Sequence, residues 1–93
     1  MLILPRNDLK KQELLEPIAA KFQKDREYLE SEVNKIIKSF DTEDHVLFRR
    51  ELINFNYLGR DPYKGVYWLK KSKLSEEELE KIAARQKKIR KIE

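Results

Sequence analysis

The 93-residue sequence has no cysteine and only two glycines, and each shortage excludes a group of proteins. Without cysteine the chain has neither a disulfide framework nor a thiolate metal site, which fits the reducing cytoplasm. With two glycines it has no glycine-rich loop of the kind that binds nucleotide phosphates. No apolar run approaches the roughly 20 residues that cross a membrane, and the initial "MLIL" is too short for a signal-peptide core. We therefore expect a soluble, cytoplasmic protein with no membrane partner.

Residues that could carry catalysis are also scarce. The only histidine, His45, falls on the apolar face of an expected helix, where a structural role is more common than a catalytic one. Carboxylates are numerous but scattered over helix faces, with no pair in an apolar pocket and no loop with the ligand spacing of a calcium site. We expect no enzymatic activity, no metal and no cofactor.

Charged residues are abundant. They make up 41% of the chain against 40% hydrophobic residues, and the net charge is +4. Apolar residues still recur in every segment, so the chain is expected to fold. The mild positive excess allows an anionic partner such as nucleic acid but does not require one.

The spacing of apolar residues predicts three helices in the first part of the chain. The first lies between residues 7 and 22 and contains Pro17, which has no N–H to donate. This predicts a kinked helix, with two short helices as the alternative. The second spans about residues 30–39 and follows a short strand around Tyr28. The third spans about residues 43–56. The apolar face of the third helix carries His45, Phe48, Leu52 and Phe55.

Residues 57–69 change to a strand-like pattern, with "YLGR" and "VYWLK" on either side of "DPYKG". Asp61 occupies the first turn position, a proline follows, and Gly65 is available for a positive φ. This predicts a β-hairpin with a type I turn closed by a glycine bulge. Adjacent strand residues point to opposite faces. One of Tyr67 and Trp68 therefore packs on the helices, and core packing is expected for Trp68.

We assign residues 1–70 to one domain and residues 71–93 to a helical tail. Ser75 and Glu78 form a capping box at the start of the tail helix. Its glutamates come first and its basic residues last, which complements the helix macrodipole. The basic residues are Arg85, Lys87, Lys88, Arg90 and Lys91. The apolar stripe consists of Leu79, Ile82, Ala83 and Ile89. Phosphate contact by the basic residues and a homodimer through Leu79, Ile82 and Ile89 are two alternative uses of the tail.

The order of these elements, three helices and then a hairpin, is that of a winged helix-turn-helix. The expected fold class is therefore mainly α with a small β-hairpin, followed by a C-terminal helix. In such proteins the third helix enters the major groove of DNA, and the hairpin forms a wing along the neighbouring backbone. The sequence thus predicts a DNA-binding or transcription-associated module.

The stretches "YLESEVNKIIKSF" and "FRRELINFNYLGR", followed by "YW", resemble a bacterial family of domains of unknown function. Members of that family occur alone or attached to helix-turn-helix transcriptional regulators. The resemblance covers about residues 4–70 and implies a winged-helix-like fold and a link to transcription, but no established activity. It rests on Tyr28, Glu30, Glu32, Val33, Asn34, Arg49, Arg50, Glu51, Leu52, Arg60, Tyr67 and Trp68. In two departures, Leu29 stands at an expected Ser/Thr cap and Asn56 at an expected helix-ending glycine.

The candidate nucleic-acid-binding residues are Arg49, Arg50, Asn54, Arg60 and Lys64. At about 100° per residue, Arg50 lies almost opposite the apolar face of the third helix, and Arg49 lies on its flank. Arginine can bind guanine, and asparagine adenine, through two hydrogen bonds each. Arg60 and Lys64 would hold the hairpin on phosphates. Alternatively, Arg50 forms an ion pair with a neighbouring carboxylate or is simply solvated.

Val46 and Ile53 lie on the same outward face and favour a different class of function. They make the face partly apolar, which marks a protein interface more often than contact with thymine methyl groups. The rival hypothesis is therefore a protein-interaction or homodimerisation module on a winged-helix scaffold, with no nucleic-acid binding. A second copy or the C-terminal helix would then cover Val46 and Ile53.

Overall fold

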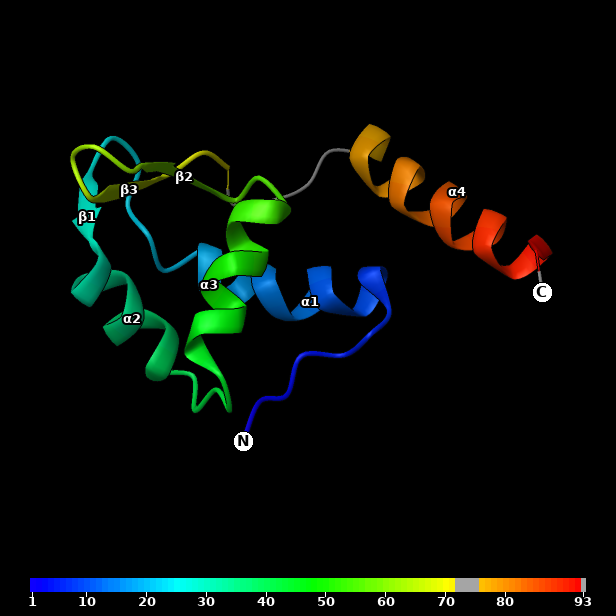
Figure 1. Ribbon diagram of the computed structural model, residues 1–93, viewed down its shortest axis with the longest axis horizontal. Coiled ribbons are helices and arrows are strands. Elements are labelled where there is room, and N and C mark those ends of the chain that lie inside the picture. Colours follow the sequence, from blue (N-terminus) through cyan, green and yellow to red (C-terminus); the bar gives the residue numbers. More distant parts are fainter. Residues whose placement is uncertain (72–75, 93) are drawn as a thin grey trace.

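The computed structural model describes residues 1–71 and 76–92, and for residues 85–92 it describes the backbone only. The described chain forms a small α+β fold of four helices and one three-stranded antiparallel sheet (Figure 1). In chain order the elements are α1 (Asp8–Ala19), β1 (Glu27–Leu29), α2 (Glu30–Lys38), α3 (His45–Asn54), β2 (Leu58–Asp61), β3 (Val66–Leu69) and α4 (Glu76–Ile92). None of the described helices is both long enough and apolar enough to cross a lipid bilayer.

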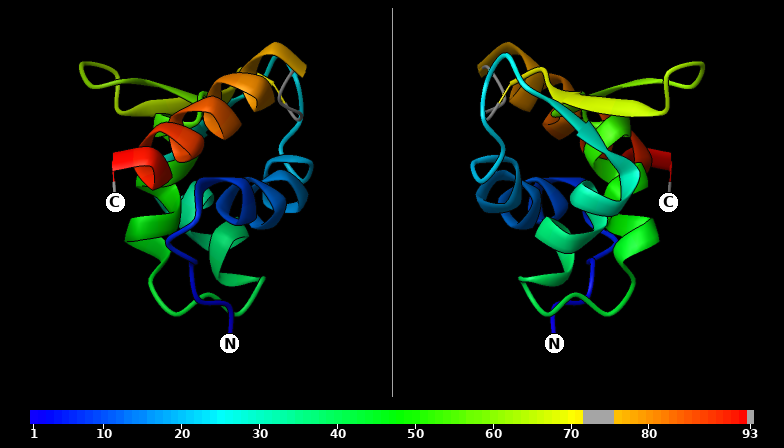
Figure 2. Two further views of the ribbon diagram at one scale, coloured as in Figure 1. Left: turned by 90° about the vertical axis from the view of Figure 1, so that its right-hand side faces the viewer. Right: turned by 90° about the vertical axis from the view of Figure 1, so that its left-hand side faces the viewer.

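The sheet has the order β1-β3-β2, so the strand expected around Tyr28 pairs with the second strand of the hairpin. Tyr28 lies opposite Tyr67, and Tyr67 lies opposite Arg60. Helices α1, α2 and α3 lie together below the sheet in the views of Figures 1 and 2. Because β1 ends at Leu29 and α2 begins at Glu30, the pairing of β1 also places the start of α2 against the hairpin.

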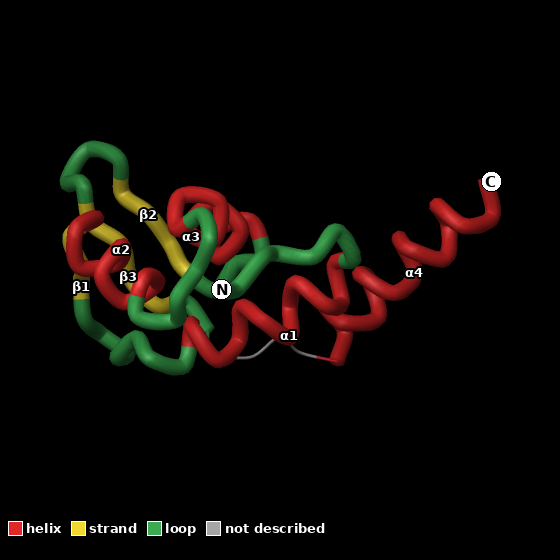
Figure 3. Tube along the Cα trace, turned by 90° about the horizontal axis from the view of Figure 1, so that it is seen from below, coloured by secondary structure: helices red, strands yellow, loops and turns green. Residues whose placement is uncertain are grey.

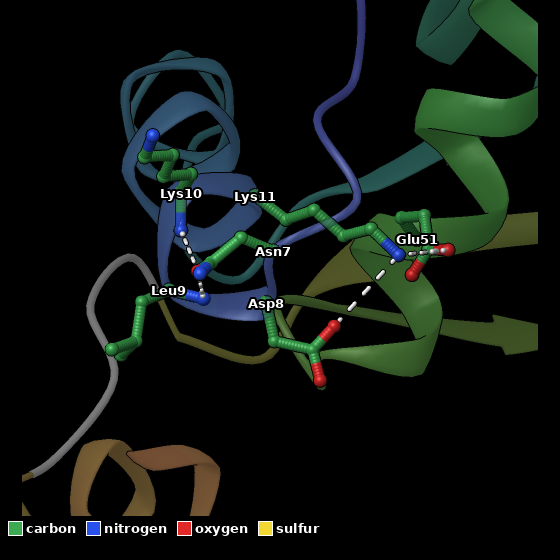
Figure 4. Close-up of polar contacts among 6 residues, drawn as sticks. All are labelled: Asn7, Asp8, Leu9, Lys10, Lys11 and Glu51. Carbon is green, nitrogen blue, oxygen red and sulfur yellow. Dashed lines mark hydrogen bonds and ion pairs between the residues drawn. The ribbon is translucent and has the colours of Figure 1, made fainter. Parts of the chain in front are cut away.

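Helix α1 is shorter than the apolar spacing predicts. Its N-cap is Asn7, whose side chain accepts hydrogen bonds from the backbone N–H groups of Leu9 and Lys10 (Figure 4). Pro17 lies in the last turn, and the helix ends at Ala19. The proline therefore lies close to the end of a short helix rather than in the middle of a longer one. Phe22, beyond the helix, is still buried.

The ends of α2 and α3 show how the two unusual cap residues are accommodated. The Leu29 side chain is apolar and cannot cap α2. Its backbone N–H instead donates to the Glu32 carboxylate at 3.0 Å. Asn56 adopts a left-handed φ of 64° just beyond α3, which asparagine tolerates. Helix α3 is nevertheless shorter at both ends than the predicted residues 43–56. The Asp44 side chain caps its start at the N–H groups of Val46 and Leu47, and the helix ends at Asn54.

The apolar face of α3 is confirmed at its centre, where Phe48 and Leu52 are fully buried. His45 and Phe55, expected on the same face, lie at the two ends of the helix and are only half-buried.

The hairpin turn is confirmed, but the expectation for Trp68 is wrong. The Asp61 carboxylate accepts hydrogen bonds from the backbone of Tyr63 and Lys64, and Gly65 has a φ of 67°. Tyr67, not Trp68, packs on the helices and is 2% exposed. Trp68 is half-buried on the opposite face of the sheet, with its indole ring over Gly59. A Cβ atom on Gly59 would overlap that ring, so the missing side chain makes room for the tryptophan there.

Helix α4 contributes to the hydrophobic core. Ile82 is 9% exposed, Leu79 packs against the buried cluster, and α4 lies beside α1. Lys71 forms an ion pair with Glu78 in the first turn of α4. Farther along, α4 extends away from the other helices (Figure 3). The apolar stripe proposed for a homodimer is therefore already covered by the chain itself at Ile82.

Several expectations for the C-terminal segment concern parts of the chain that lie outside the structural description. These are the cap residue Ser75 and the side chains of Ile89, Arg85, Lys87, Lys88, Arg90 and Lys91.

A partly buried polar cluster joins α1 to the segment before β2. The Tyr57 hydroxyl donates to Glu16 Oε2 at 3.1 Å, and the Gln12 side chain donates to the same carboxylate. Tyr57 is fully buried. Burial and, secondarily, the negative charge of Glu16 raise the pKa of Tyr57 far above its usual range.

Replacing Ile82 by alanine should lower the free energy of unfolding by about 2 kcal/mol, since it removes buried methyl groups and leaves a cavity. Urea unfolding measures the change. Lys81→Ala, at the exposed neighbouring position, is the matched control and should change stability by less than about 0.5 kcal/mol. Equal stabilities of the two variants would mean that α4 is not part of the folding unit.

The Tyr57 hydroxyl should also make the stability sensitive to alkali. Because its pKa is higher in the folded than in the unfolded state, its contribution is present below the unfolded value of about 10 and lost as the pH rises above it. Tyr57→Phe should cost about 1 kcal/mol at neutral pH and lose less stability than the wild type above pH ~10. Parallel pH profiles of the two proteins, measured by urea unfolding, would contradict this.

Candidate nucleic-acid interface

A groove of about 270 Å³ lies between α3 and the hairpin, and it collects four of the five residues selected from the sequence. These four are Arg49, Arg50, Asn54 and Arg60, whereas Lys64 lies outside the groove at the hairpin tip. The groove is completed by Val46, Ile53 and Tyr67. One helix face and one strand therefore bring three guanidinium groups to a single opening.

Arg50 and Asn54 form the open part of this surface. Both are exposed, and they lie one turn apart on α3. Across the described residues, Arg50 has no hydrogen bond, ion pair or ring contact. Neither of the neighbouring carboxylates, Glu43 and Asp44, pairs with it among the described residues, and the Asp44 side chain caps the helix instead. The Arg50 guanidinium is thus free to bind a partner from solution.

Arg49 is engaged within the protein, although it precedes Arg50 directly. Its side chain is 17% exposed. One terminal nitrogen donates to Asn34 Oδ1 at 2.5 Å, and the other lies 3.4 Å from Glu30 Oε1. Both partners belong to α2, so Arg49 joins α3 to α2 and contributes its charge from the floor of the groove.

Tyr67 connects the same carboxylate to the hairpin. Its hydroxyl donates to Glu30 Oε1 at 3.2 Å, and the Arg60 guanidinium lies 5.8 Å from the centre of its ring. Burial raises the pKa of Tyr67, against the lowering effect of the positive charges on Arg60 and Arg49. The Tyr67 hydroxyl therefore stays protonated at physiological pH and can donate its hydrogen bond to Glu30.

The hairpin extends beyond the groove and projects from the body on the same side as α3 (Figure 2). Lys64 and Tyr63 lie in its turn, and Tyr63 is 99% exposed. The two Asp61 hydrogen bonds hold this turn in shape. Lys64 is therefore placed to contact a partner that is larger than the groove itself.

A second cavity, of about 630 Å³, lies at the other end of α3, between that helix, the start of α1 and α4. Its lining includes the carboxylates of Asp8, Glu51 and Glu78. Lys11 reaches both Asp8, at 3.8 Å, and Glu51, at 3.4 Å (Figure 4). The charged residues of its lining are these three carboxylates and Lys81, in contrast to the basic groove. Asn54 lines both cavities.

Sequence reasoning found the open residues of the groove but missed those that support it. Glu30 and Asn34 lie on α2, and no spacing within α3 or the hairpin points to them. Their separation of four residues puts them on one face of α2, which is compatible with a shared partner but does not identify Arg49.

In a comparison with family models, residues 2–69 match the family described as "Uncharacterized protein conserved in bacteria (DUF2087)". No curated protein and no solved structure matches the chain.

The two adjacent arginines should differ sharply in their effect on stability. Arg49→Ala removes a charged hydrogen bond and an ion pair from a largely covered site and should lower the free energy of unfolding by about 2 kcal/mol. Arg50→Ala, which removes the same charge one residue later, should change it by less than about 0.5 kcal/mol. Urea unfolding of both variants tests this, and equal losses would show that the partners of Arg49 contribute nothing.

Proposed function

The chain belongs to the family of uncharacterized proteins conserved in bacteria, and from that premise we propose that it is a winged-helix module that binds double-stranded DNA in transcription. The order helix, strand, two helices and hairpin supports the winged-helix assignment. The pairing order β1-β3-β2 supports it further, because the first strand then joins the hairpin as it does in a winged helix.

The observation that carries the proposal is the open basic groove between α3 and the hairpin. The groove is lined by Arg50, Asn54 and Arg60, and among the residues whose side chains are described none from α4 contributes to its lining. An α-helix fits the major groove of DNA, which is about 12 Å wide. The exposure of Arg50 and Asn54 on this side of α3 supports its contact with a duplex.

In the proposed complex α3 lies in the major groove. Arg50 and Asn54 face the base edges, where arginine binds guanine and asparagine binds adenine. Arg60 and Lys64 contact phosphates on the flanking strand. Val46, 41% exposed, and Ile53 face thymine methyl groups. Arg49 adds positive charge from the groove floor while it holds α3 on α2.

Titration of a mixed-sequence duplex at several salt concentrations tests the proposal. The affinity should fall steeply with salt, with a slope of about −0.9 in the log–log plot for each phosphate contact. Arg50→Ala should weaken binding by about 1–3 kcal/mol, and Arg60→Ala should reduce the slope by about one contact. The control is Lys21→Ala, in a separate groove, which should bind like the wild type.

Absence of binding at low salt would rule out DNA as the partner. Normal binding by Arg50→Ala together with Arg60→Ala would leave DNA as the partner but reject the groove as the site.

The exposure of Val46 supports a second candidate, a protein-interaction or homodimerisation module that uses the same face of α3. Under this alternative a second copy or another protein covers Val46 and Ile53, and no duplex binds. Sedimentation of the wild type and of Val46→Glu tests the homodimer form of this alternative, because only a protein that self-associates through this face would become smaller in the variant.

A further inference from the structure

We infer that Glu30 is a positioning residue of the proposed DNA-binding surface and that it fixes the orientation of α3 relative to the hairpin. The inference rests on the proposed function and adds to it a residue that would not itself contact DNA. Glu30 is the first residue of α2 and lies outside the groove lining.

A single carboxylate oxygen of Glu30 contacts two other elements. Glu30 Oε1 lies 3.4 Å from Arg49 of α3 and accepts the hydrogen bond of Tyr67 of β3 at 3.2 Å. On the next turn of α2, Asn34 Oδ1 accepts a hydrogen bond from the other terminal nitrogen of Arg49, so two residues of α2 bind one guanidinium group. The contact with Arg49 is an ion pair, and the Tyr67 hydroxyl donates to a charged carboxylate, which makes that hydrogen bond stronger than one between neutral groups.

The link continues from Tyr67 to the groove. Arg60 lies directly opposite Tyr67 in the sheet, and its guanidinium rests over the tyrosine ring. Glu30 thus orients the ring that supports Arg60 and also holds the helix that presents Arg50. Without these Glu30 contacts, Arg50 and Arg60 no longer keep a fixed spacing. Binding of a base by one and a phosphate by the other would then cost more conformational entropy.

Charge alone and a positioning role predict opposite changes in DNA affinity when Glu30 is removed, so the direction of the change tests the inference. Glu30 is a negative charge, 54% exposed, that pairs with Arg49 at the edge of a groove lined by three arginines. Removing a negative charge near a phosphate-binding surface should tighten binding if charge were the only effect. A positioning role predicts weaker binding.

The experiment compares Glu30→Ala with Glu27→Ala in the salt-dependent duplex titration. Glu27 is three residues earlier, on the face of the sheet that carries Trp68, and has the same charge and no partner among the described residues. Glu27→Ala should bind as well as the wild type or slightly better. Glu30→Ala should bind at least five-fold more weakly, whereas Glu30→Gln, which keeps an acceptor oxygen, should recover most of the affinity.

Tyr67→Phe provides a milder test that keeps the ring under Arg60 and removes only the hydroxyl. It should weaken binding, and the double variant with Glu30→Ala should be no weaker than Glu30→Ala alone, because both break the same link. Thermal unfolding confirms that each variant is folded at the temperature of the titration.

The possible failures are distinguishable. No binding by the wild type overturns the proposed function and this inference with it. Binding by the wild type, with Glu30→Ala equal to it or tighter, overturns the inference alone. Additive effects of Glu30→Ala and Tyr67→Phe would likewise overturn the link through Tyr67.

Discussion

The pairing of β1 with β3 is the constraint on which the rest of the structure depends. Only three residues form β1, yet they place Tyr28 opposite Tyr67 and deliver the chain directly into α2. Tyr28 is buried, its ring meets Phe22 edge-on at 5.0 Å, and its hydroxyl accepts the N–H of Gln23 at 2.7 Å. Because no loop separates β1 from α2, the position of the strand also decides where α2 meets α3 and the hairpin.

The consequence for the surface is a division of roles between Arg49 and Arg50. Consecutive helix residues point about 100° apart, so two identical side chains meet different surroundings. Arg49 points towards α2 and finds Asn34 and Glu30, whereas Arg50 points into solution. Holding the first arginine internally gives the second a rigid base, which reduces the freedom that a bound partner would have to restrict.

Much of the fold follows from local pattern. The period of Phe48 and Leu52 identifies the inner face of α3, and Asp61 with Gly65 identifies the turn. The patterns cannot tell which of two adjacent aromatic residues points inward, because strand alternation is satisfied either way. The choice depends on Gly59, whose missing side chain accommodates the larger ring on the outer face. Likewise, the partners of Arg49 and of Ile82 come from distant elements and leave no local trace.

The contact between Gly59 and Trp68 restricts the variation of both positions together. A Cβ at position 59 would lie too close to the indole, so a larger residue there requires the ring to shift or the residue at position 68 to be smaller. A substitution at position 59 alone is therefore destabilising. A larger residue at position 59 combined with a smaller residue at position 68 is tolerated. Natural or selected variants of this sheet should therefore alter the two residues in compensation rather than one at a time.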